Sequence, residues 1–204
     1  PCSTQCAGLS YRHAGQCIFV SYSGTSGDGV FLTTNHGTSW SETGLMQYYI
    51  LSLAVSDTNI YAGGGFCGHG GCVSYVFLST DNGTSWSDIS IEGVEAPISA
   101  LAISGTYLFA GTTGEGVFLT TDNGTNWTKI NNGLSDTVVN SLVMSGTNLF
   151  AGTDSCIFLT TNNGTSWAQV NTGLMYHSVR ALSVSDTNIF VGTGHSGVWK
   201  RPLS

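Results

Sequence analysis

Three residues that can bind a metal or form a disulfide lie close together in one glycine-rich stretch, GGGFCGHGGCVSY at 63–75. They are Cys67, His69 and Cys72. Thiolates and imidazole are the ligands that zinc prefers, but a structural zinc site needs four ligands, and the sequence supplies no evident residues to complete the set. A local disulfide between Cys67 and Cys72 is the simpler expectation, and we predict neither a metal nor a cofactor.

Side chains that would support catalysis are scattered along the chain. Acidic residues such as Glu42, Glu92, Glu95 and Glu115 lie between apolar segments without an obvious partner, whereas glycoside hydrolysis needs two opposed carboxyl groups. The five histidines are also dispersed, and no Ser/His/Asp group stands at a recognisable spacing. We therefore predict that the chain is not an enzyme.

The elements that position these residues come from a repeat. The segment FLTTDNGTNW at 118–127 recurs at 31–40, 77–86 and 158–167, and a broken copy, VWKRPLS, occupies 198–204. The spacing is about 40 residues throughout. Such a period is typical of repeat architectures, in which each unit buries its apolar faces against its neighbours.

Each repeat contains four short apolar runs separated by Gly, Asn, Ser and Asp, for example 141–145, 148–152, 156–160 and 166–170. Clusters of these small polar residues mark hairpin turns. Four strands in about 40 residues are typical of one propeller blade. We predict an all-β, five-bladed β-propeller of four-stranded antiparallel blades. It forms a single domain over 1–204, with a non-repeat segment at 1–8 and blades that start near 9, 50, 98, 138 and 179.

The repeated segment resembles the Asp-box, or BNR repeat, of sialidase-type, sortilin-type and photosystem-assembly-factor-type propellers. The pattern of that box is Ser/Thr-x-Asp-x-Gly-x-x-Trp. Two copies keep the Asp and two carry Asn instead. The resemblance implies that the acid or amide caps a turn and that the Trp fills space between sheets. The residues concerned are Asn35, Gly37, Trp40, Asp81, Gly83, Trp86, Asp122, Gly124, Trp127, Asn162, Gly164 and Trp167.

The sialidase branch of that family would need an arginine cluster to bind a carboxylate. The three arginines of this chain, Arg12, Arg180 and Arg201, fall at non-equivalent positions of the repeat. The resemblance therefore implies a fold and not an activity.

The composition limits the partners and the compartment. The chain has 12 acidic and 5 basic residues and a net charge of −7, which argues against nucleic acid as a partner. Apolar runs reach only about five residues, too few for a membrane span. Six cysteines and a charged fraction of only 8% indicate an extracellular or cell-surface protein.

Four further cysteines, Cys2, Cys6, Cys17 and Cys156, have no partner close in sequence. The expected strand directions place Cys17 near one face of the propeller, and Cys6 and Cys156 near the other. Since a disulfide spans a short distance, we expect one from the Cys2/Cys6 segment to a neighbouring blade or to another subunit.

Loops on one face of a rigid scaffold commonly carry binding sites. The longest second-to-third strand loop is the glycine-rich segment at 63–75. Aromatic and histidine side chains expected on that face form a candidate binding surface, or else cover the mouth of the ring. They are Tyr22, Tyr48, Tyr49, Phe66, His69, Tyr75, Tyr176 and His195.

The last blade is incomplete, because the broken copy at 198–204 carries neither the acid nor the Trp of the box. An open sheet edge can accept a strand from a neighbour. Two interpretations follow. The first is a structural or adhesive module that assembles with copies of itself, as a filament or a surface array, through this blade and the N-terminal cysteines. The second is a lectin-like propeller whose partner is a surface glycan or protein. We expect the first.

Overall fold

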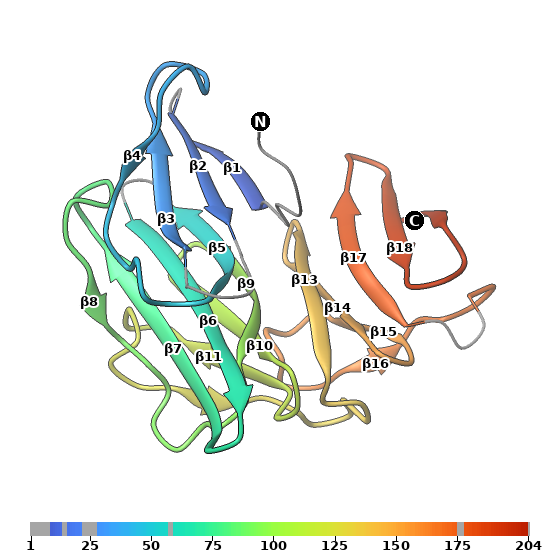
Figure 1. Ribbon diagram of the computed structural model, residues 1–204. Helices are drawn as coiled ribbons and strands as arrows, with labels where there is room; N and C mark the ends of the chain where they lie inside the picture. Colours follow the sequence, from blue (N-terminus) through green and yellow to red (C-terminus); the bar gives the residue numbers. More distant parts are fainter. Residues whose placement is uncertain (1–8, 14–15, 22–27, 57–58, 175–177, 204) are drawn as a thin grey trace. The chain divides into compact units, whose positions relative to one another are not determined.

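The computed structural model describes residues 9–13, 16–21, 28–56, 59–174 and 178–203. These residues form β-strands and no helix (Figure 1), so the all-β prediction is confirmed. The chain divides into two compact units, Pro1–Ile98 and Ser99–Ser204, with the boundary inside one strand.

The first unit holds two four-stranded antiparallel sheets, each in sequence order. The strands of the first sheet are β1 (Leu9–His13), β2 (Gln16–Ser21), β3 (Asp28–Thr33) and β4 (Ser41–Glu42). Those of the second are β5 (Ile50–Ser56), β6 (Asn59–Gly68), β7 (Gly71–Ser79) and β8 (Ser87–Asp88).

The second unit holds three sheets, of which the last has three strands in the described chain. The third sheet contains β9 (Ile98–Ser104), β10 (Tyr107–Thr112), β11 (Val117–Thr120) and β12 (Thr128–Lys129). The fourth contains β13 (Val139–Ser145), β14 (Asn148–Thr153), β15 (Ile157–Thr160) and β16 (Ala168–Gln169). The fifth contains β17 (Val179–Val184), β18 (Asn188–Thr193) and β19 (Val198–Pro202).

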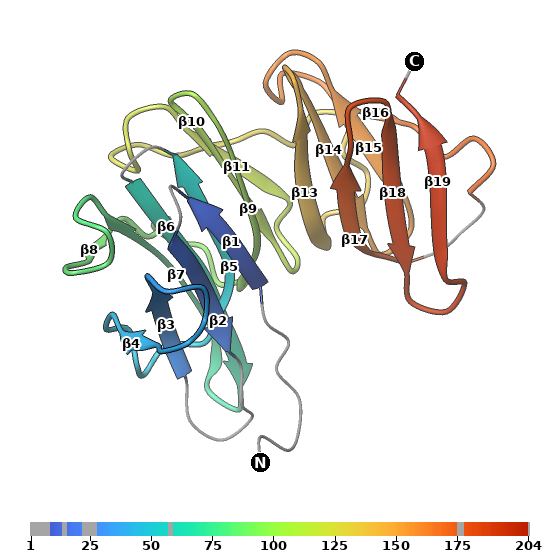
Figure 2. The same ribbon diagram turned by 90° about the horizontal axis from the view of Figure 1, so that it is seen from above.

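The sheets therefore match the expected blades, including the incomplete last one. Their first strands begin at Leu9, Ile50, Ile98, Val139 and Val179. Figure 2 shows β17, β18 and β19 in that order, with β19 at the outer edge of its sheet.

Neighbouring sheets of one unit pack through their middle strands, which are apolar on both faces. Ala110 and Ala151 are fully buried, and each is followed by a glycine. A Cβ on Gly111 would lie 2.6 Å from Val139 Cγ1, and one on Gly152 would lie 2.4 Å from Val179 Cγ1. The repeated Ala-Gly pair thus makes room for the first valine of the next sheet.

Candidate functional site

The box segments, 33–40, 79–86, 120–127 and 160–167, form one repeated turn. Its first side chain is a buried hydroxyl, that of Thr33, Ser79, Thr120 or Thr160. In the second sheet, Ser79 Oγ donates to Asp81 Oδ1 at 2.9 Å and accepts from the backbone N–H of Gly83 at 2.8 Å. The buried hydroxyl thus bonds to both sides of the turn, so that polar groups shielded from water have hydrogen-bond partners.

The acid or amide at the third box position caps the turn. Asp81 Oδ1 accepts from the backbone N–H of Ser85 at 2.9 Å, and Asp122 does the same for Asn126 at 2.9 Å. Asn162 accepts from Ser166 N–H at 3.0 Å. Since Asn and Asp share this acceptor oxygen, either residue supports the turn.

The tip of each box has two successive residues with positive φ. Asn82 has φ 56° and Gly83 has φ 84°, and the first box has His36 at φ 56° where the others have Asn. Two positive φ values in a row define a type I′ turn, which favours Asn-Gly. His36 adopts the same backbone conformation as the Asn of the other boxes, and His is also enriched at positive φ.

Asp81 and Asp122 are held in their charged form. Hydrogen bonds from the Ser85 hydroxyl and N–H, and from Ser79, lower the pKa of Asp81 from 3.8 to about 2. The pKa of Asp122 is lowered by hydrogen bonds from the Asn126 side chain and N–H and from Thr120. These carboxylates act as turn acceptors and not as proton donors.

Two of the box tryptophans, Trp86 and Trp167, connect adjacent sheets. Trp86 Nε1 donates to the carbonyl of Thr43 at 2.8 Å, and Trp167 Nε1 donates to the carbonyl of Ile130 at 2.6 Å. Thr43 and Ile130 each follow the outer strand of the preceding sheet. We call this contact the outer latch.

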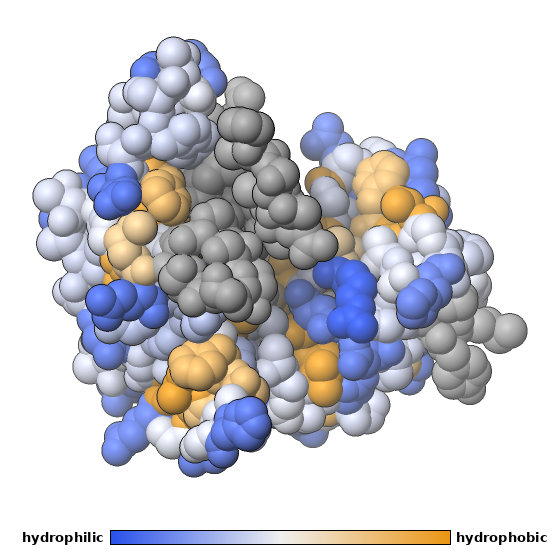
Figure 3. Space-filling model, viewed as in Figure 1, coloured by the Kyte–Doolittle hydropathy of each residue, from blue (hydrophilic) through white to orange (hydrophobic). Residues whose placement is uncertain are grey.

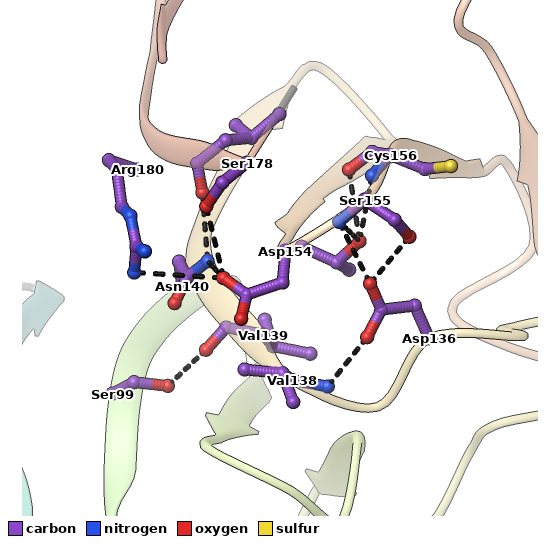
Figure 4. Close-up of polar contacts among 12 residues, drawn as sticks. Ser99, Asp136, Val138, Val139, Asn140, Asp154, Ser155, Cys156, Ser178 and Arg180 are labelled. Atoms are coloured by element: carbon purple, nitrogen blue, oxygen red, sulfur yellow. Dashed lines mark hydrogen bonds and ion pairs between the residues drawn. The ribbon is translucent and has the colours of Figure 1, made fainter. Parts of the chain in front are cut away.

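An inner latch joins the first strands of successive sheets (Figure 4). The Ser99 hydroxyl donates to the carbonyl of Val139. Asn140, one repeat later, donates from Nδ2 to the carbonyl of Val179 at 2.9 Å. Each donor reaches the first strand of the next sheet, so the latch repeats with the blade.

Two carboxylates support this inner region. Asp154 Oδ1 accepts from Asn140 Nδ2 at 2.9 Å and from Ser178 Oγ at 3.0 Å, and Arg180 Nη1 lies 3.6 Å away (Figure 4). Asp136 Oδ2 accepts from the hydroxyl of Ser155 at 2.6 Å. Both carboxylates are thus used to hold loops together.

Burial raises the pKa of Asp136, but hydrogen bonds from the Ser155 hydroxyl, the Val138 N–H and Thr153 outweigh it. The pKa therefore lies below its usual value. Asp136 does not have the raised pKa of a general acid.

Four residues of the predicted binding surface come together in the first unit. The ring centroids of Tyr48 and Tyr75 are 5.0 Å apart, and those of Tyr49 and Phe66 are 5.3 Å apart. Tyr75 donates from its hydroxyl to the Tyr49 carbonyl at 2.9 Å, and burial raises the pKa of Tyr75 to about 12. Phe77 also joins the group, with its ring 4.7 Å from that of Tyr48. We call these five residues the aromatic group.

The long β6–β7 hairpin carries the exposed part of this group. Phe66 and Val73 are cross-strand partners and are 48% and 45% exposed. Figure 3 shows hydrophobic surface over the free end of β6 and β7. Near the tip, a disulfide joins Cys67 and Cys72, as expected, and His69 lies exposed in the turn.

Of the other predicted residues, one more is described, and it lies elsewhere. His195 lies exposed in the loop between β18 and β19, in the other unit. Tyr22, Tyr176, Cys2 and Cys6 lie outside the described residues, and Cys17 is described only as part of strand β2.

Cys156 forms no disulfide within the described part of this chain, and a bond to another subunit stays a prediction. Cys156 is a free and buried cysteine within the cluster that contains Phe158 and Trp167. Its Sγ accepts from Gln169 Nε2 at 2.9 Å.

A groove lies between the fourth and fifth sheets. Its volume is about 370 Å³, and its walls come from β14, β15, β18, β19 and the segment after β16. All five residues of β19 are exposed, and Val198 is 76% exposed. The side of β19 away from β18 pairs with no other described strand, and we call it the open edge.

Sequence reasoning predicted the incomplete blade but missed the groove and the inner latch. The signal for the groove lies in the repeat register, because its walls are the repeat equivalents of residues that surround Trp167. The inner latch had no such signal, since Ser99 and Asn140 are different residue types.

In the part of the chain that the structure describes, no three His, Cys, Asp or Glu side chains gather closely enough to hold a metal ion. No helix there is long and apolar enough to cross a membrane.

No family model matches the chain, and no curated protein matches its sequence. Solved structures resemble its fold. The GH74 enzyme of Niastella koreensis superimposes with a TM-score of 0.75 at 17% identity, over 96% of this chain and 35% of that one. YCF48 bound to D1 peptide gives 0.65 at 15% identity, over 92% and 62%. The computationally designed Ika8 protein gives 0.63 at 13% identity, over 95% and 57%.

The chain therefore has a β-propeller fold, with four four-stranded blades and a three-stranded fifth blade in the described residues. It spans about a third of the GH74 enzyme and less than two thirds of the other two proteins. At these identities the likeness concerns the fold alone.

Proposed function

We propose that this chain is a non-catalytic extracellular module of the Asp-box propeller family, and that it assembles with copies of itself through the open edge. The observation that carries the proposal is the exposed side of β19 that pairs with no other described strand, in a sheet with three described strands where the others have four. A sheet edge with unpaired backbone groups is a template for a strand from another chain.

The charged residues near the open edge suit a homotypic contact. Lys200 and Arg201 lie in β19, whereas the chain as a whole has a net charge of −7. Opposite charges steer two surfaces together. A second copy of an acidic chain is a suitable partner for this strand.

The uses of the carboxylates support a non-catalytic role. Asp81 and Asp122 cap turns, and Asp136 and Asp154 hold loops of the fourth blade. A group committed to structural hydrogen bonds in its charged form is a poor acid catalyst. An extracellular setting is supported by the Cys67–Cys72 disulfide, because such bonds persist in oxidising compartments.

Sedimentation velocity and negative-stain electron microscopy of the purified chain test the proposal. We expect ordered oligomers that grow with concentration. The variant Val198→Lys places a charge on the open edge and is expected to prevent assembly. Val73→Lys, at an exposed valine of the β6–β7 hairpin, is the matched control and should assemble normally. A chain that stays monomeric across the micromolar range contradicts the proposal.

A second candidate function, glycan binding, is favoured by the aromatic group. Tyr48 and Phe66 are 39% and 48% exposed, and they lie against Tyr75 and Tyr49. Exposed aromatic rings that cluster on a rigid hairpin offer flat apolar surface with polar ends. A glycan array with Phe66→Ala, and with Tyr107→Ala as a control at another exposed ring, tests this candidate. Binding that is lost in the first variant and kept in the second would support it.

A further inference from the structure

The chain contains the dipeptide that loses its side-chain amide most readily in water, Asn-Gly, at four places. They are Asn82-Gly83, Asn123-Gly124, Asn132-Gly133 and Asn163-Gly164. In this reaction the backbone nitrogen of the glycine attacks the asparagine Cγ, and glycine hinders its own nitrogen least because it has no Cβ. Three of the pairs belong to the box turns, whereas the pair at 132–133 lies in the connection between the third and fourth sheets.

The box turns occupy the nitrogen that would attack. Gly83 N–H donates to the buried Ser79 hydroxyl at 2.8 Å, and Gly164 N–H donates to the buried Thr160 hydroxyl at 2.9 Å. The corresponding bond of the third box is 3.0 Å long. Gly83 and Gly164 are themselves buried. A nitrogen held in this way must give up a hydrogen bond inside the protein before solvent can remove its proton.

The pair Asn132-Gly133 lacks this protection. Both residues are exposed. The Gly133 N–H donates to no other residue of the described chain, although the turn around it is closed by a 2.9 Å bond from Leu134 N–H to the Asn131 carbonyl. The nitrogen of Gly133 is therefore available to solvent base in the folded protein.

A hydrogen bond from the fourth sheet favours removal of that proton. The backbone N–H of Trp167 donates to the Asn132 carbonyl at 2.8 Å. This carbonyl and the Gly133 nitrogen belong to one peptide group, and resonance moves the negative charge of the deprotonated group onto the carbonyl oxygen. A fixed donor at the place where charge develops stabilises the reactive form.

The side chain of Asn132 contacts the same segment. Its Nδ2 donates to the Thr165 carbonyl at 3.1 Å. Through its carbonyl and its amide, Asn132 thus makes two hydrogen bonds to the box segment of the fourth sheet. We call this pair of bonds the Asn132 seam.

We propose that Asn132 is a site of spontaneous deamidation and that the box hydroxyls protect the other three pairs. The Gly133 nitrogen loses its proton to solvent base and forms a bond to Asn132 Cγ. The bond between Cγ and Nδ2 then breaks, and Nδ2 takes up a proton and leaves as ammonia. The reaction needs no partner chain and is independent of the proposed self-assembly.

Water opens the succinimide ring that results. Addition of water at Cγ breaks the bond from Cγ to the Gly133 nitrogen and gives aspartate. Addition at the backbone carbonyl carbon breaks the bond from that carbon to the same nitrogen and gives isoaspartate. Overall, asparagine and water yield an acid and ammonia, and nothing is oxidised or reduced.

Both products weaken the Asn132 seam. Aspartate places a carboxylate, which only accepts hydrogen bonds, against the Thr165 carbonyl in place of the Nδ2 donor. Isoaspartate also diverts the main chain through Cβ and Cγ, so the acceptor of the Trp167 N–H leaves the backbone. Either product adds a negative charge to a chain whose net charge is already −7. Deamidation thus loosens the contact between the third and fourth sheets beside the outer latch.

Peptide mapping by mass spectrometry compares the four pairs in one sample. The purified chain is incubated at mildly alkaline pH and physiological temperature, once folded and once in concentrated urea. In the folded chain, Asn132 should deamidate about tenfold faster than Asn82 or Asn163, which is the effect of one good hydrogen bond on the attacking nitrogen. In urea the turns are lost, and the four pairs should react at similar rates.

A variant of the second box tests the protecting hydroxyl. Ser79→Ala frees the Gly83 N–H and should speed deamidation of Asn82 about three- to tenfold. Asn163 of the same molecule is the matched control and should keep its native rate, because its own box is intact. Ser79→Thr supplies the hydroxyl that the other three boxes carry and should restore the slow rate. If Ser79→Ala does not fold, the four native pairs decide the question.

The effect on the seam has its own measurement. Urea denaturation of the incubated native chain should show a lower midpoint as the modified fraction of Asn132 grows. Asn132→Gln is the control, because a glutamine closes the larger imide ring much more slowly, and its midpoint should not change with incubation.

Three results would contradict the proposal. Equal rates at Asn132 and at the box asparagines of the folded chain overturn it. The same ranking of rates in urea also overturns it, because the sequence and not the fold would then set the rates. An unchanged rate at Asn82 in folded Ser79→Ala overturns the role of the box hydroxyl.

Discussion

The indole Nε1 of Trp167 donates a 2.6 Å hydrogen bond to the backbone carbonyl of Ile130, 37 residues earlier in the chain. The side chain starts in one blade and contacts the residue that directly follows the outer strand of the preceding blade. Trp86 makes the same contact with Thr43. A single repeat cannot bury both faces of its sheet, and this hydrogen bond holds it against the neighbouring repeat near the outer strands.

Replacing the indole should cost more at Trp167, which is deeply buried, than at the more exposed Trp40. Trp167→Phe removes the N–H, leaves the Ile130 carbonyl without that donor and opens a small cavity. We expect a loss of about 2–4 kcal/mol in the free energy of unfolding. Trp40→Phe is the matched control at an indole that is 40% exposed and should cost less than about 1 kcal/mol. Urea denaturation of both variants gives the comparison, and equal losses would contradict the outer latch.

Two equivalent glycines differ in whether the backbone of a neighbouring segment packs against them. Gly133 and Gly173 both have φ +85°. A Cβ on Gly133 would lie 2.4 Å from the Trp167 carbonyl oxygen, whereas one on Gly173 would meet nothing within 4 Å. Gly173→Ala should therefore cost about 1–2 kcal/mol for its backbone conformation alone. Gly133→Ala should cost at least about 1 kcal/mol more because of the contact.

Denaturation of the monomeric chain measures both variants. Equal losses in Gly173→Ala and Gly133→Ala would contradict the close contact between position 133 and the Trp167 backbone.

The box acids predict a difference in acid stability between the native chain and an amide variant. The pKa of Asp81 in the folded chain is about 2, below its usual 3.8, and that of Asp122 is also lowered. A lowered pKa stabilises the fold above the unfolded pKa, and this stability is lost as the pH falls from about 4 towards 2. The variant Asp81→Asn with Asp122→Asn should lose less stability over that window.

At neutral pH the same double variant should remain close to the native chain. Asn already caps the turn in the first and fourth boxes, where Asn35 and Asn162 accept from backbone N–H groups at 2.9 and 3.0 Å. Unfolding curves at pH 7 and at several lower values give the measurement. Parallel loss of stability in both proteins would show that these carboxylates do not contribute.

Much of this fold follows from the repeat alone. The boxed segment predicts the hairpin turn, because Asn-Gly suits two positive φ values, and Asn82 and Gly83 adopt them. The short spacing of Cys67 and Cys72 predicts their disulfide. These features are local, so residue type and spacing are sufficient to predict them.

Contacts between blades were harder to predict. Cys156 looks like a disulfide partner in the sequence, yet its place in the cluster with Trp167 buries it. Arg201 replaces a threonine of the repeat, and its bond to the Val170 carbonyl depends on the blade that precedes it. Such contacts join residues about 30 to 40 positions apart, so they require the packed structure.

The buried Tyr75 leads to a prediction at alkaline pH. Burial raises its pKa from 10 to about 12, and its hydroxyl donates to the Tyr49 carbonyl at 2.9 Å. A raised pKa stabilises the fold below the unfolded value, and this stability is lost as the pH rises from about 10 to 12. Tyr75→Phe should cost about 1–3 kcal/mol at neutral pH, because the carbonyl loses its donor, and should remove that part of the alkaline loss. Ultraviolet absorbance titration of the native chain should show one tyrosine with a pKa of about 12 that is absent from the Tyr75→Phe variant. If the tyrosine lost in the variant instead has the usual pKa of 10, Tyr75 is exposed to solvent and the aromatic group is not packed as described.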